Sequence, residues 1–504
     1  MHNNKSSENR IIGYYLGKVI TILGIIQVIP LVTSLIYREW DIAISFLTGM
    51  SITLITGSIL VISCSPAKRK KITWGHGMII ASLSWFTGMI LCAIPYYLSG
   101  NFISFLDACF FVMSGFTTTG LALIQDLDHV SNGINMWRHM LTYLGGQGMI
   151  VLALTFLVKS TSGSYRLYVG EAKDEQLLPN VVSTSKAIWY ISVSYLVVGT
   201  TVLWLSGFFI GIPVDRAFLH ALWIFMAAWS TGGFSPQTQN MLYYHSLWYE
   251  IITMILFIVG SFNFALHYAV WNKNRKEITK NIEIQSMSVT AVILTIITIA
   301  GLMKLNVYPD FIAAFRKGFY LLISGHTTTG FMTIYAKQFF NEWGELALFA
   351  VIIAMLIGGS ACSTAGGFKG LRVGIIFKGF FREIKRIILP ESRIQVDKFH
   401  HIGDIVLEDR HLRSAMLIVL AYIATFMVGT LSGVAFGYPF TSAAFEAASV
   451  TGNVGLSIGI TLAAMPDTLK IIYIFIMWVA RLEFMAVLAL GTYLIFRLRK
   501  KWLR

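Results

Sequence analysis

The chain has 504 residues, of which 56% are hydrophobic and only 13% are charged. Soluble proteins carry about 25% charged residues, so the composition excludes a soluble globular protein and indicates one that crosses a membrane several times. The formal net charge is +14, and the placement of the basic residues sets the predicted orientation of the spans.

The chain starts with two long apolar stretches, which we interpret as transmembrane helices over about residues 12–37 and 41–64. A helix of roughly 20 apolar residues is long enough to span the bilayer. The first stretch is too long for the apolar core of a signal peptide and lacks a clear small-residue cleavage site. We therefore expect it to be retained as a helix.

A motif then recurs four times, anchored on the glycines Gly120, Gly233, Gly330 and Gly455. An aromatic residue lies ten positions before each anchor, small residues lie six and twelve positions before it, and a proline precedes each unit. Self-similarity of this kind indicates a repeated structural unit. We expect each repeat to hold a long apolar helix, a short helix too short to span, and a second long helix.

The predicted spans of the repeats pair as residues 76–98 with 137–158, 187–210 with 247–270, 287–303 with 345–376, and 415–436 with 469–496. With the two N-terminal helices this makes ten spans and four re-entrant hairpins in an all-α polytopic membrane protein. The predicted segments are the two extra helices in 1–73 and the pore repeats in 74–160, 161–272, 273–395 and 396–504, the last with a basic C-terminus.

Lysine and arginine gather in alternate loops. With Lys5 and Arg10, one set of loops holds 27 of the 39 such residues, whereas the other set holds 8. The basic set comprises the loops at 68–71, 159–186, 273–280 and 378–413 and the C-terminal RLRKKWLR. The positive-inside rule puts both termini in the cytoplasm. Every repeat starts and ends at a basic loop, so the repeats are predicted to be parallel rather than inverted. The basic loops are expected to face lipid headgroups and could also dock a cytoplasmic partner.

Each short helix leads into a polar string that must carry non-helical backbone at membrane depth, which is tolerated only inside protein or beside a wet cavity. Four such strings around one axis would offer rings of carbonyl oxygens that replace the hydration shell of a monovalent cation, with the negative ends of the helix dipoles nearby. The alternative is a set of surface loops or helix-packing small residues. The predicted filter residues are Thr117, Thr118, Thr119, Gly120, Ser230, Thr231, Gly232, Gly233, Thr327, Thr328, Thr329, Gly330, Gly452, Asn453, Val454 and Gly455, with the ion expected at Thr118, Thr231, Thr328 and Asn453.

The second helix of the third repeat is interrupted by IGGSACSTAGGFKG, which has five glycines within 358–370. Such a break predicts a loop below the filter that blocks or opens the path, and close helix packing is the alternative. Arg481 sits near the middle of the last long span, where an ionisable residue is a functional candidate; a buried ion pair with another helix is the alternative. The predicted gate residues are Gly358, Gly359, Ser360, Ser363, Thr364, Gly366, Gly367 and Arg481.

These motifs resemble the Trk/Ktr/HKT superfamily of potassium transporters, and most closely its Trk-type membrane subunit, over essentially the whole chain. The stretches that carry the resemblance are IPYYLSG (94–100), SGFTTTG (114–120), LGGQGMIVLA (144–153), SGHTTTGF (324–331), IGGSACSTAGGFK (357–369), TGNVGLSIG (451–459) and ARLEF (480–484). The resemblance implies four helix–pore-helix–helix units around one pseudo-fourfold pore, potassium uptake across the cell membrane, an intramembrane gating loop and a pore-facing Arg481. It also implies a homodimer and a separate cytoplasmic nucleotide-binding regulatory subunit of the TrkA type.

In this superfamily a serine in place of the first filter glycine goes with sodium transport, so Gly120 favours potassium. The string Thr231-Gly232-Gly233-Phe234 departs from the Asn-Ala-Gly-Phe of many relatives. A sodium-permeable protein, or a sodium- or proton-coupled potassium symporter, is therefore the alternative function. We expect His326, beside the third string, to be a packed or hydrogen-bonded residue rather than a pH sensor.

The sequence does not favour an enzyme. An intramembrane metalloenzyme would need clustered His, Asp or Glu, but the eleven histidines are scattered and no HExxH motif occurs. No glycine-rich phosphate loop follows a strand, so we expect potassium as the transported ligand and no nucleotide bound by this chain itself.

Overall fold

The computed structural model describes residues 2–67, 72–124, 126–148, 151, 181–388 and 396–502. The basic loop at 68–71 and most of the one at 159–186 lie outside the described residues, as do the side chains of the C-terminal RLRKKWLR. The chain forms two compact units: Met1–Thr117 with Ala122–Val198 and Leu462–Arg504, and Thr118–Leu121 with Gly199–Thr461.

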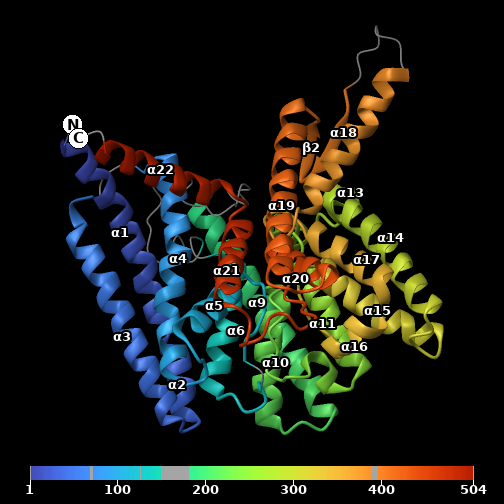
Figure 1. Cartoon of the computed structure of the whole chain (residues 1–504), viewed down its shortest axis with the longest axis horizontal. Coiled ribbons are helices and arrows are strands. Elements are labelled where there is room, and N and C mark those ends of the chain that lie inside the picture. Colours follow the sequence, from blue (N-terminus) through green and yellow to red (C-terminus); the bar gives the residue numbers. More distant parts are fainter. Residues whose placement is uncertain are drawn as a thin grey trace. The chain divides into compact units, whose positions relative to one another are not determined.

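The first unit is built on helices, among them α1, α3 and α4 (Figure 1). Gly17 and Gly57 lie at the contact between two of these helices, where a side chain on either would overlap the backbone of the other. Close backbone approach of this kind is typical of helices in membranes. The helices are α1 (His2–Ile26), α2 (Val28–Ile36), α3 (Trp40–Ser63), α4 (Trp74–Leu98), α5 (Phe105–Phe116), α6 (Asn132–Gln147), α21 (Asp467–Arg481) and α22 (Met485–Trp502), with the 3-10 turn η1 (Ser65–Ala67).

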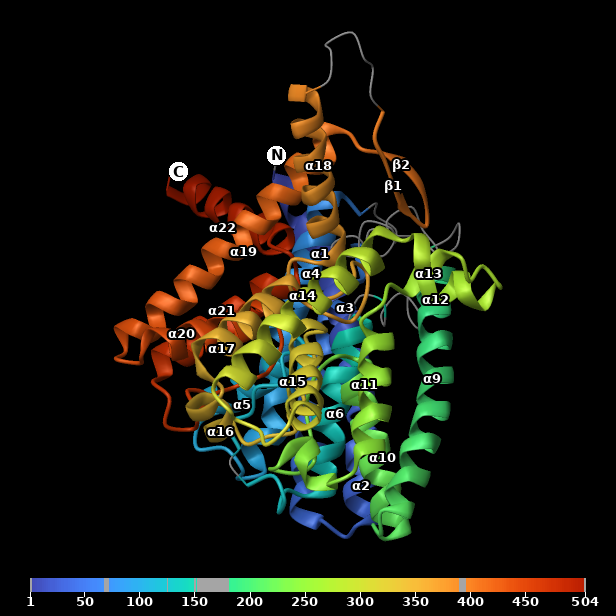
Figure 2. The ribbon, with the colours of Figure 1, turned by 90° about the vertical axis from the view of Figure 1, so that its right-hand side faces the viewer.

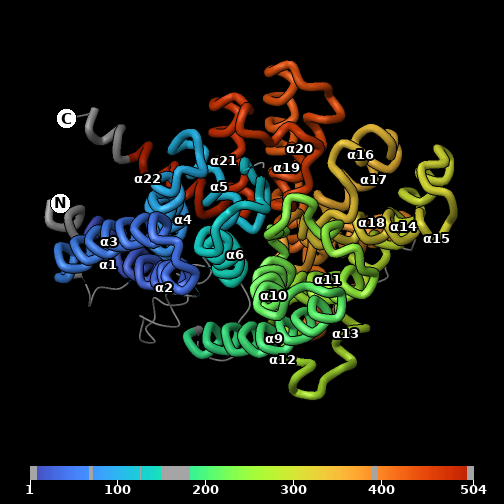
Figure 3. Tube along the Cα trace, turned by 90° about the horizontal axis from the view of Figure 1, so that it is seen from below, coloured from blue at the N-terminus to red at the C-terminus, as the bar shows by residue number. Residues whose placement is uncertain are grey.

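The second unit holds the rest of the described chain, and α9 (Val181–Phe209) runs from the first unit into it. In Figure 3, α9 flanks α10, and α10 lies beside α11. Phe339, Trp343 and Phe445 pack together within one buried hydrophobic cluster of the second unit. The helices are α10 (Val214–Trp229), α11 (Leu247–Gly260), α12 (Phe264–Trp271), α13 (Glu277–Lys280), α14 (Ile282–Lys304), α15 (Phe311–His326), α16 (Ala336–Glu342), α17 (Gly344–Ile357), α18 (Gly370–Ile388), α19 (Asp409–Ala435) and α20 (Phe440–Gly452), with the 3-10 turn η2 (Asn240–Tyr244).

The described residues contain six helices long and apolar enough to cross a membrane, or up to eight if two bent pairs each count as one span. These six lie where the sequence predicts spans at 12–37, 41–64, 76–98, 187–210, 287–303 and 415–436. The span predicted at 137–158 is helical as α6 up to Gln147, and most of its remainder lies outside the described residues.

Three predicted spans are interrupted. The span at 345–376 divides into α17 and α18, as its glycine-rich break predicts. The spans at 247–270 and 469–496 were expected to be continuous, but they bend by 100° and 113°. Asn263 caps the new helix α12 through a bond from the Ala265 amide, and Glu483 and Phe484 take positive φ angles of 48° and 69°. These local backbone features end each helix in spite of its apolar composition.

The four short helices that the repeat predicts are present as α5, α10, α15 and α20. Ser104 and Asp310 cap α5 and α15 through their side-chain oxygens, and Pro213 and Pro439 precede the first residues of α10 and α20. Proline and short polar residues are typical of helix starts. Each of these helices therefore begins at a local signal and ends at its polar string.

A β-hairpin, unexpected from the sequence, joins α18 to α19 (Figure 2). Its strands β1 (Lys398–His401) and β2 (Gly403–Val406) are antiparallel, with Phe399 opposite Ile405. Phe399 is buried in a small core with Ile282 of α14 and Leu407. The hairpin was missed because its strands have only four residues each and lie in a polar, basic loop.

Candidate ion filter and gate

Each polar string turns sharply at an equivalent residue. Thr118, Thr231, Thr328 and Asn453 have positive φ angles of 56°, 50°, 56° and 53°. This left-handed conformation is unusual for a β-branched residue such as threonine. All four residues are fully buried. Strained backbone that recurs at buried, equivalent positions is typical of functional sites.

Hydrogen bonds at the helix ends explain the turn. The amides of Gly232, Thr329 and Val454 each bond the carbonyl five residues back, at 2.7, 2.8 and 2.9 Å. These bonds close a helix C-terminus of the Schellman type, in which the residue before the donor is left-handed. Glycine usually fills that place, whereas three of the four strings use threonine and so keep a hydroxyl there.

The anchor glycines are the closest points between strings. Their φ angles are +82°, +62°, +85° and +92° in chain order. A Cβ atom on Gly120 would overlap the carbonyl oxygen of Gly232, and each later anchor meets the next string in the same way. The remaining pairs are Gly233 with Thr329, Gly330 with Val454, and Gly455 with Thr119. The contacts run from the first string to the second, third and fourth and back to the first, so the strings close a ring.

Side-chain bonds add to the ring. The Asn453 amide nitrogen donates to the Thr119 hydroxyl at 3.1 Å, which joins the fourth string to the first. Thr117, Ser230 and Thr327 each donate a hydroxyl to the helix carbonyl four residues back, at 2.7 to 2.8 Å. The first residue of these strings therefore ties the string to its helix.

The glycine-rich loop between α17 and α18 contacts all four strings. The Thr364 hydroxyl lies 3.2 Å from the Thr231 hydroxyl, and the Thr364 carbonyl accepts from the Thr118 hydroxyl at 3.5 Å. The Gly366 amide donates to the Thr328 hydroxyl at 2.8 Å. A Cβ on Gly366 would overlap the carbonyl oxygen of Gly452 in the fourth string.

The loop is also anchored outside the strings. The Thr364 hydroxyl bonds the carbonyls of Gly260 and Trp229 at 2.8 and 3.1 Å. Gly358 and Gly367 have φ angles of +74° and +77° and pack against each other's backbone. The Lys369 ammonium donates to the Ala365 carbonyl within the loop. These bonds and close backbone contacts hold the loop against the ends of α10 and α11.

The predicted gate residues do not all lie in one unit. Gly358, Gly359, Ser360, Ser363, Thr364, Gly366 and Gly367 lie in the loop of the second unit, whereas Arg481 belongs to the first. Arg481 is the last residue of α21 and lies at the 113° bend in the middle of the pair α21–α22, where the sequence predicts one continuous span. Its Nη2 donates to the Gly145 carbonyl at 3.0 Å. His326 is buried, with Nε2 2.8 Å from the Thr290 hydroxyl, as a packed residue should be.

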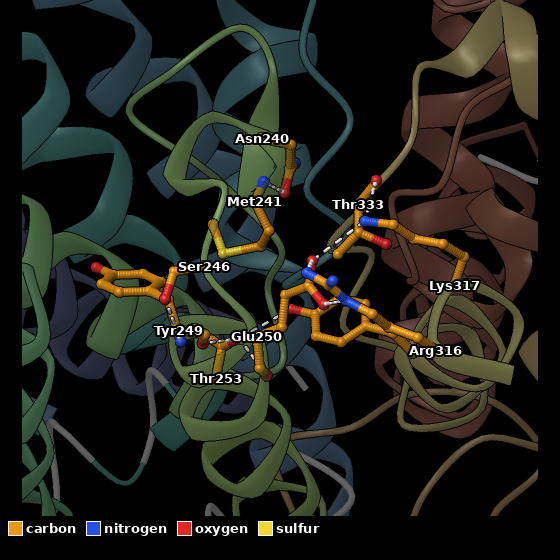
Figure 4. Close-up of polar contacts among 10 residues, drawn as sticks. Asn240, Met241, Ser246, Tyr249, Glu250, Thr253, Arg316, Lys317 and Thr333 are labelled. Carbon is orange, nitrogen blue, oxygen red and sulfur yellow. Dashed lines mark hydrogen bonds and ion pairs between the residues drawn. The ribbon is translucent and has the colours of Figure 1, made fainter. Parts of the chain in front are cut away.

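Two buried carboxylates near the strings were not predicted. Glu250 of α11 pairs with Arg316 at 2.7 Å and with Lys317 at 3.2 Å, and Lys317 also donates to the Thr333 carbonyl after the third string (Figure 4). Glu446 of α20 accepts the amides of Ile458 and Ile460 after the fourth string, at 3.1 and 3.2 Å. The only signal for them in the sequence is acidic residues next to apolar segments, which does not reveal their partners.

Apolar helices that enclose buried, non-helical polar backbone form the architecture of a membrane transport protein. The model of the TrkH family, described as cation transport protein, matches residues 43–494, and the chain belongs to this family. It is therefore a multi-pass membrane transport protein and not an enzyme.

Known relatives match this chain along nearly their whole length. An uncharacterised cation transporter of Methanocaldococcus jannaschii is 32% identical over 96% of this chain and 95% of its own. The potassium uptake protein TrkH of Halomonas elongata is 28% identical over 96% and 98%. The crystal structure of the potassium transporter TrkH from Vibrio parahaemolyticus matches with a TM-score of 0.81 and 26% identity, over 95% of this chain and 98% of that one.

Proposed function

We propose that this chain takes up potassium across the cell membrane through a channel-like filter formed by the four strings. The observation that carries the proposal is the closed ring in which each anchor glycine meets a carbonyl of the next string. Potassium sheds its water most easily where carbonyl oxygens replace the hydration shell. Relatives named as potassium uptake proteins and a potassium transporter support the choice of ion.

In this proposal four parallel helix–pore-helix–helix repeats surround one pseudo-fourfold axis, after two extra N-terminal helices. The left-handed residues Thr118, Thr231, Thr328 and Asn453 turn the backbone so that the ion is held at their level. A sodium-permeable filter, or coupling of potassium to sodium or protons, is the alternative, and the atypical Gly232 before Gly233 is the reason to test it.

The loop at 358–370 acts in this proposal as the gate. Its bonds to Thr118, Thr231 and Thr328 place peptide groups against the strings, so an ion can pass only after the loop moves. Arg481 adds a positive barrier on the path. The membrane potential, at about 2.3 kcal/mol per charge per 100 mV, would drive inward movement.

Both termini are proposed to lie in the cytoplasm, where the basic loops gather. The functional form is proposed to be a homodimer with a cytoplasmic nucleotide-binding regulatory subunit of the TrkA type docked on those loops. The chain itself would then bind potassium as its transported ligand, and the nucleotide would bind the partner.

Competitive flux into proteoliposomes tests the filter, with potassium, rubidium, sodium and lithium compared for the purified chain and for Gly120→Ser. Overpacking a tight site costs about 1–3 kcal/mol, so the substitution should lower potassium flux about tenfold or more and raise the sodium-to-potassium ratio. Gly437→Ser is the matched control, because Gly437 has a similar φ of +88° but no neighbour within 4 Å. Equal effects of the two substitutions would contradict the filter.

Arg481→Ala and a deletion within 358–367 test the gate in the same vesicles. If the intact chain shows no potassium flux because the gate is closed, both variants should show flux. Absence of flux in every variant under every gradient would contradict the channel proposal.

A further inference from the structure

The start of α14 contacts both the glycine-rich loop and the cytoplasmic β-hairpin. Glu283, in the first turn of α14, is fully buried. Its Oε1 accepts the Ala361 amide of the loop at 2.6 Å, and its Oε2 lies 3.9 Å from Nδ1 of His401 in β1. One carboxylate therefore lies between two segments that are 40 residues apart in the chain.

Neighbouring contacts hold the loop to α14 at both ends. The Ser286 hydroxyl donates to the Gly370 carbonyl at 2.7 Å, where the loop ends. Near its start, the Ser360 hydroxyl contacts the Met287 sulfur at 3.5 Å. The first turns of α14 therefore hold both ends of the loop.

A second carboxylate holds the hairpin. Glu277 of α13 is buried, accepts the Ile402 amide at 3.0 Å and lies 3.0 Å from Nε2 of His400. An isolated two-stranded hairpin is marginally stable in water. Its position therefore depends on contacts with the helices, among them the bond to Glu277, the burial of Phe399 and the bond from the Lys378 ammonium to the Lys398 carbonyl at 3.0 Å.

The outer side of the hairpin is open. Ile402, Gly403 and Asp404 at its turn are exposed, and Gly403 has no neighbour within 4 Å of a Cβ position. The turn of the hairpin is therefore accessible to a partner.

We propose that Glu283 is a positioning residue that couples the β-hairpin at 398–406 to the loop at 358–370. The proposal rests on the gating role proposed above for that loop. While the hairpin is docked, it keeps water from the Glu283 carboxylate, and the bond to the Ala361 amide is strong. When the hairpin moves away, water competes for the carboxylate, the bond weakens and the loop is released.

Cys362 gives a direct measurement of loop position, because it lies in the loop and is only 9% exposed. The full chain would be prepared with Cys64, Cys92 and Cys109 replaced by alanine, and the reaction of Cys362 with a small methanethiosulfonate reagent timed. Glu283→Ala should speed this reaction about tenfold or more, since it removes a hydrogen bond to a charged acceptor. Glu283→Gln should have a smaller effect than Glu283→Ala, because its neutral amide oxygen can still accept the same N–H.

The coupling itself is tested by combining substitutions. His401→Ala should speed the Cys362 reaction when Glu283 is present and add nothing when Glu283 is alanine. Glu342→Gln is the matched control, an exposed carboxylate on α16 that accepts a bond from Gln338 of the same helix. An unchanged rate in Glu283→Ala, or an equal His401→Ala effect in both backgrounds, would overturn the proposal.

If Glu283→Ala does not fold, His401→Ala and Glu277→Ala decide, because both loosen the hairpin and leave the loop's acceptor in place. Unchanged Cys362 rates in both would overturn the coupling.

Potassium flux in the same vesicles separates this proposal from the proposed function. If the Cys362 rates change but no variant, including the loop deletion, carries potassium flux, only the transport proposal is contradicted. If potassium flux is selective but the Cys362 reaction rates are unchanged, only the coupling proposal is contradicted.

Discussion

Paired charges hold the short helices in both units. Asp107 and Lys317 each lie thirteen residues before an anchor glycine, and each is paired in the structure. Lys470 lies 2.6 Å from Asp107, with both side chains 4% exposed, and Glu250 pairs with Lys317 and Arg316. The same position therefore carries opposite charges in two repeats. A buried charge needs its partner, because an uncompensated one is strongly destabilising.

Replacement of Glu250 by alanine should lower the free energy of unfolding. Loss of one member of a buried pair costs about 3–5 kcal/mol. Because the Arg316 side chain is 38% exposed and can turn to solvent, we expect about 2 kcal/mol. Thermal unfolding in detergent measures this, with the exposed Glu342→Gln as control. A melting temperature equal to that of the control would contradict the prediction.

The loop between α17 and α18 is held in place by hydrogen bonds to other elements. The Thr364 hydroxyl contacts the Gly260 carbonyl, the Trp229 carbonyl and the Thr231 hydroxyl. One side chain therefore joins the loop to α10, α11 and the second string. Removing its hydroxyl should weaken the attachment of the loop to all three.

Thr364→Val keeps the shape of the side chain but removes the hydroxyl. A neutral hydrogen bond contributes about 0.5–1.5 kcal/mol, so the released state of the loop should become about fivefold more populated. Potassium flux without a partner should rise accordingly. Thr425→Val on α19, where the hydroxyl makes only a bond within its helix, is the control. A fall in flux, or the same rise in both variants, would show that the hydroxyl does not hold the loop.

The β-hairpin should respond to pH through His400. Hydrogen bonds that the His400 ring donates to the carboxylates of Asp404 and Glu277, in that order of effect, raise the pKa of His400 above its ordinary 6.5. The contact with His400 also lowers the pKa of Asp404. The other charges near this pair are Lys398 and Lys280. Since the folded state favours protonated His400, docking is strongest below pH 6.5 and weakens as pH rises through the raised pKa.

Amide-exchange protection of Ile402, which donates to Glu277, measures hairpin docking once corrected for intrinsic exchange. Protection should fall as the pH rises above 6.5 and through the raised pKa of His400. His400→Gln should remove this dependence. A flat profile for the unaltered chain would contradict it.

For the molecule as a whole, the alternation of basic loops predicts which loops face the cytoplasm. Single cysteines at Gly403, in the hairpin turn, and at Lys337, in α16, are both at exposed positions. In intact cells an impermeant thiol reagent should label Lys337→Cys and spare Gly403→Cys, which should react only after permeabilisation. Labelling of Gly403→Cys from outside would reverse the proposed orientation.

Much of the fold follows from the sequence because apolar length is enough to identify a membrane span. Six predicted spans are helices of the expected place and type, and the short helices begin and end near their signals. The bends at 261–263 and 482–484 were missed because they arise from caps and left-handed residues within apolar stretches. The hairpin was missed because eight strand residues in a polar loop carry no periodic signal.

The membrane class, the four anchors and the glycine-rich break can all be inferred from the sequence. Composition identifies the membrane class, and glycines at positions that need an unusual backbone conformation identify the anchors and the break. The tertiary structure decided that Gly120 meets Gly232, that Thr364 and Gly366 contact the strings, and that Glu283 lies between the loop and the hairpin. Those contacts join residues about 40 to more than 200 positions apart. No local pattern encodes such pairs, because a hydrogen bond depends on where folding brings each backbone group and not on the residues beside it.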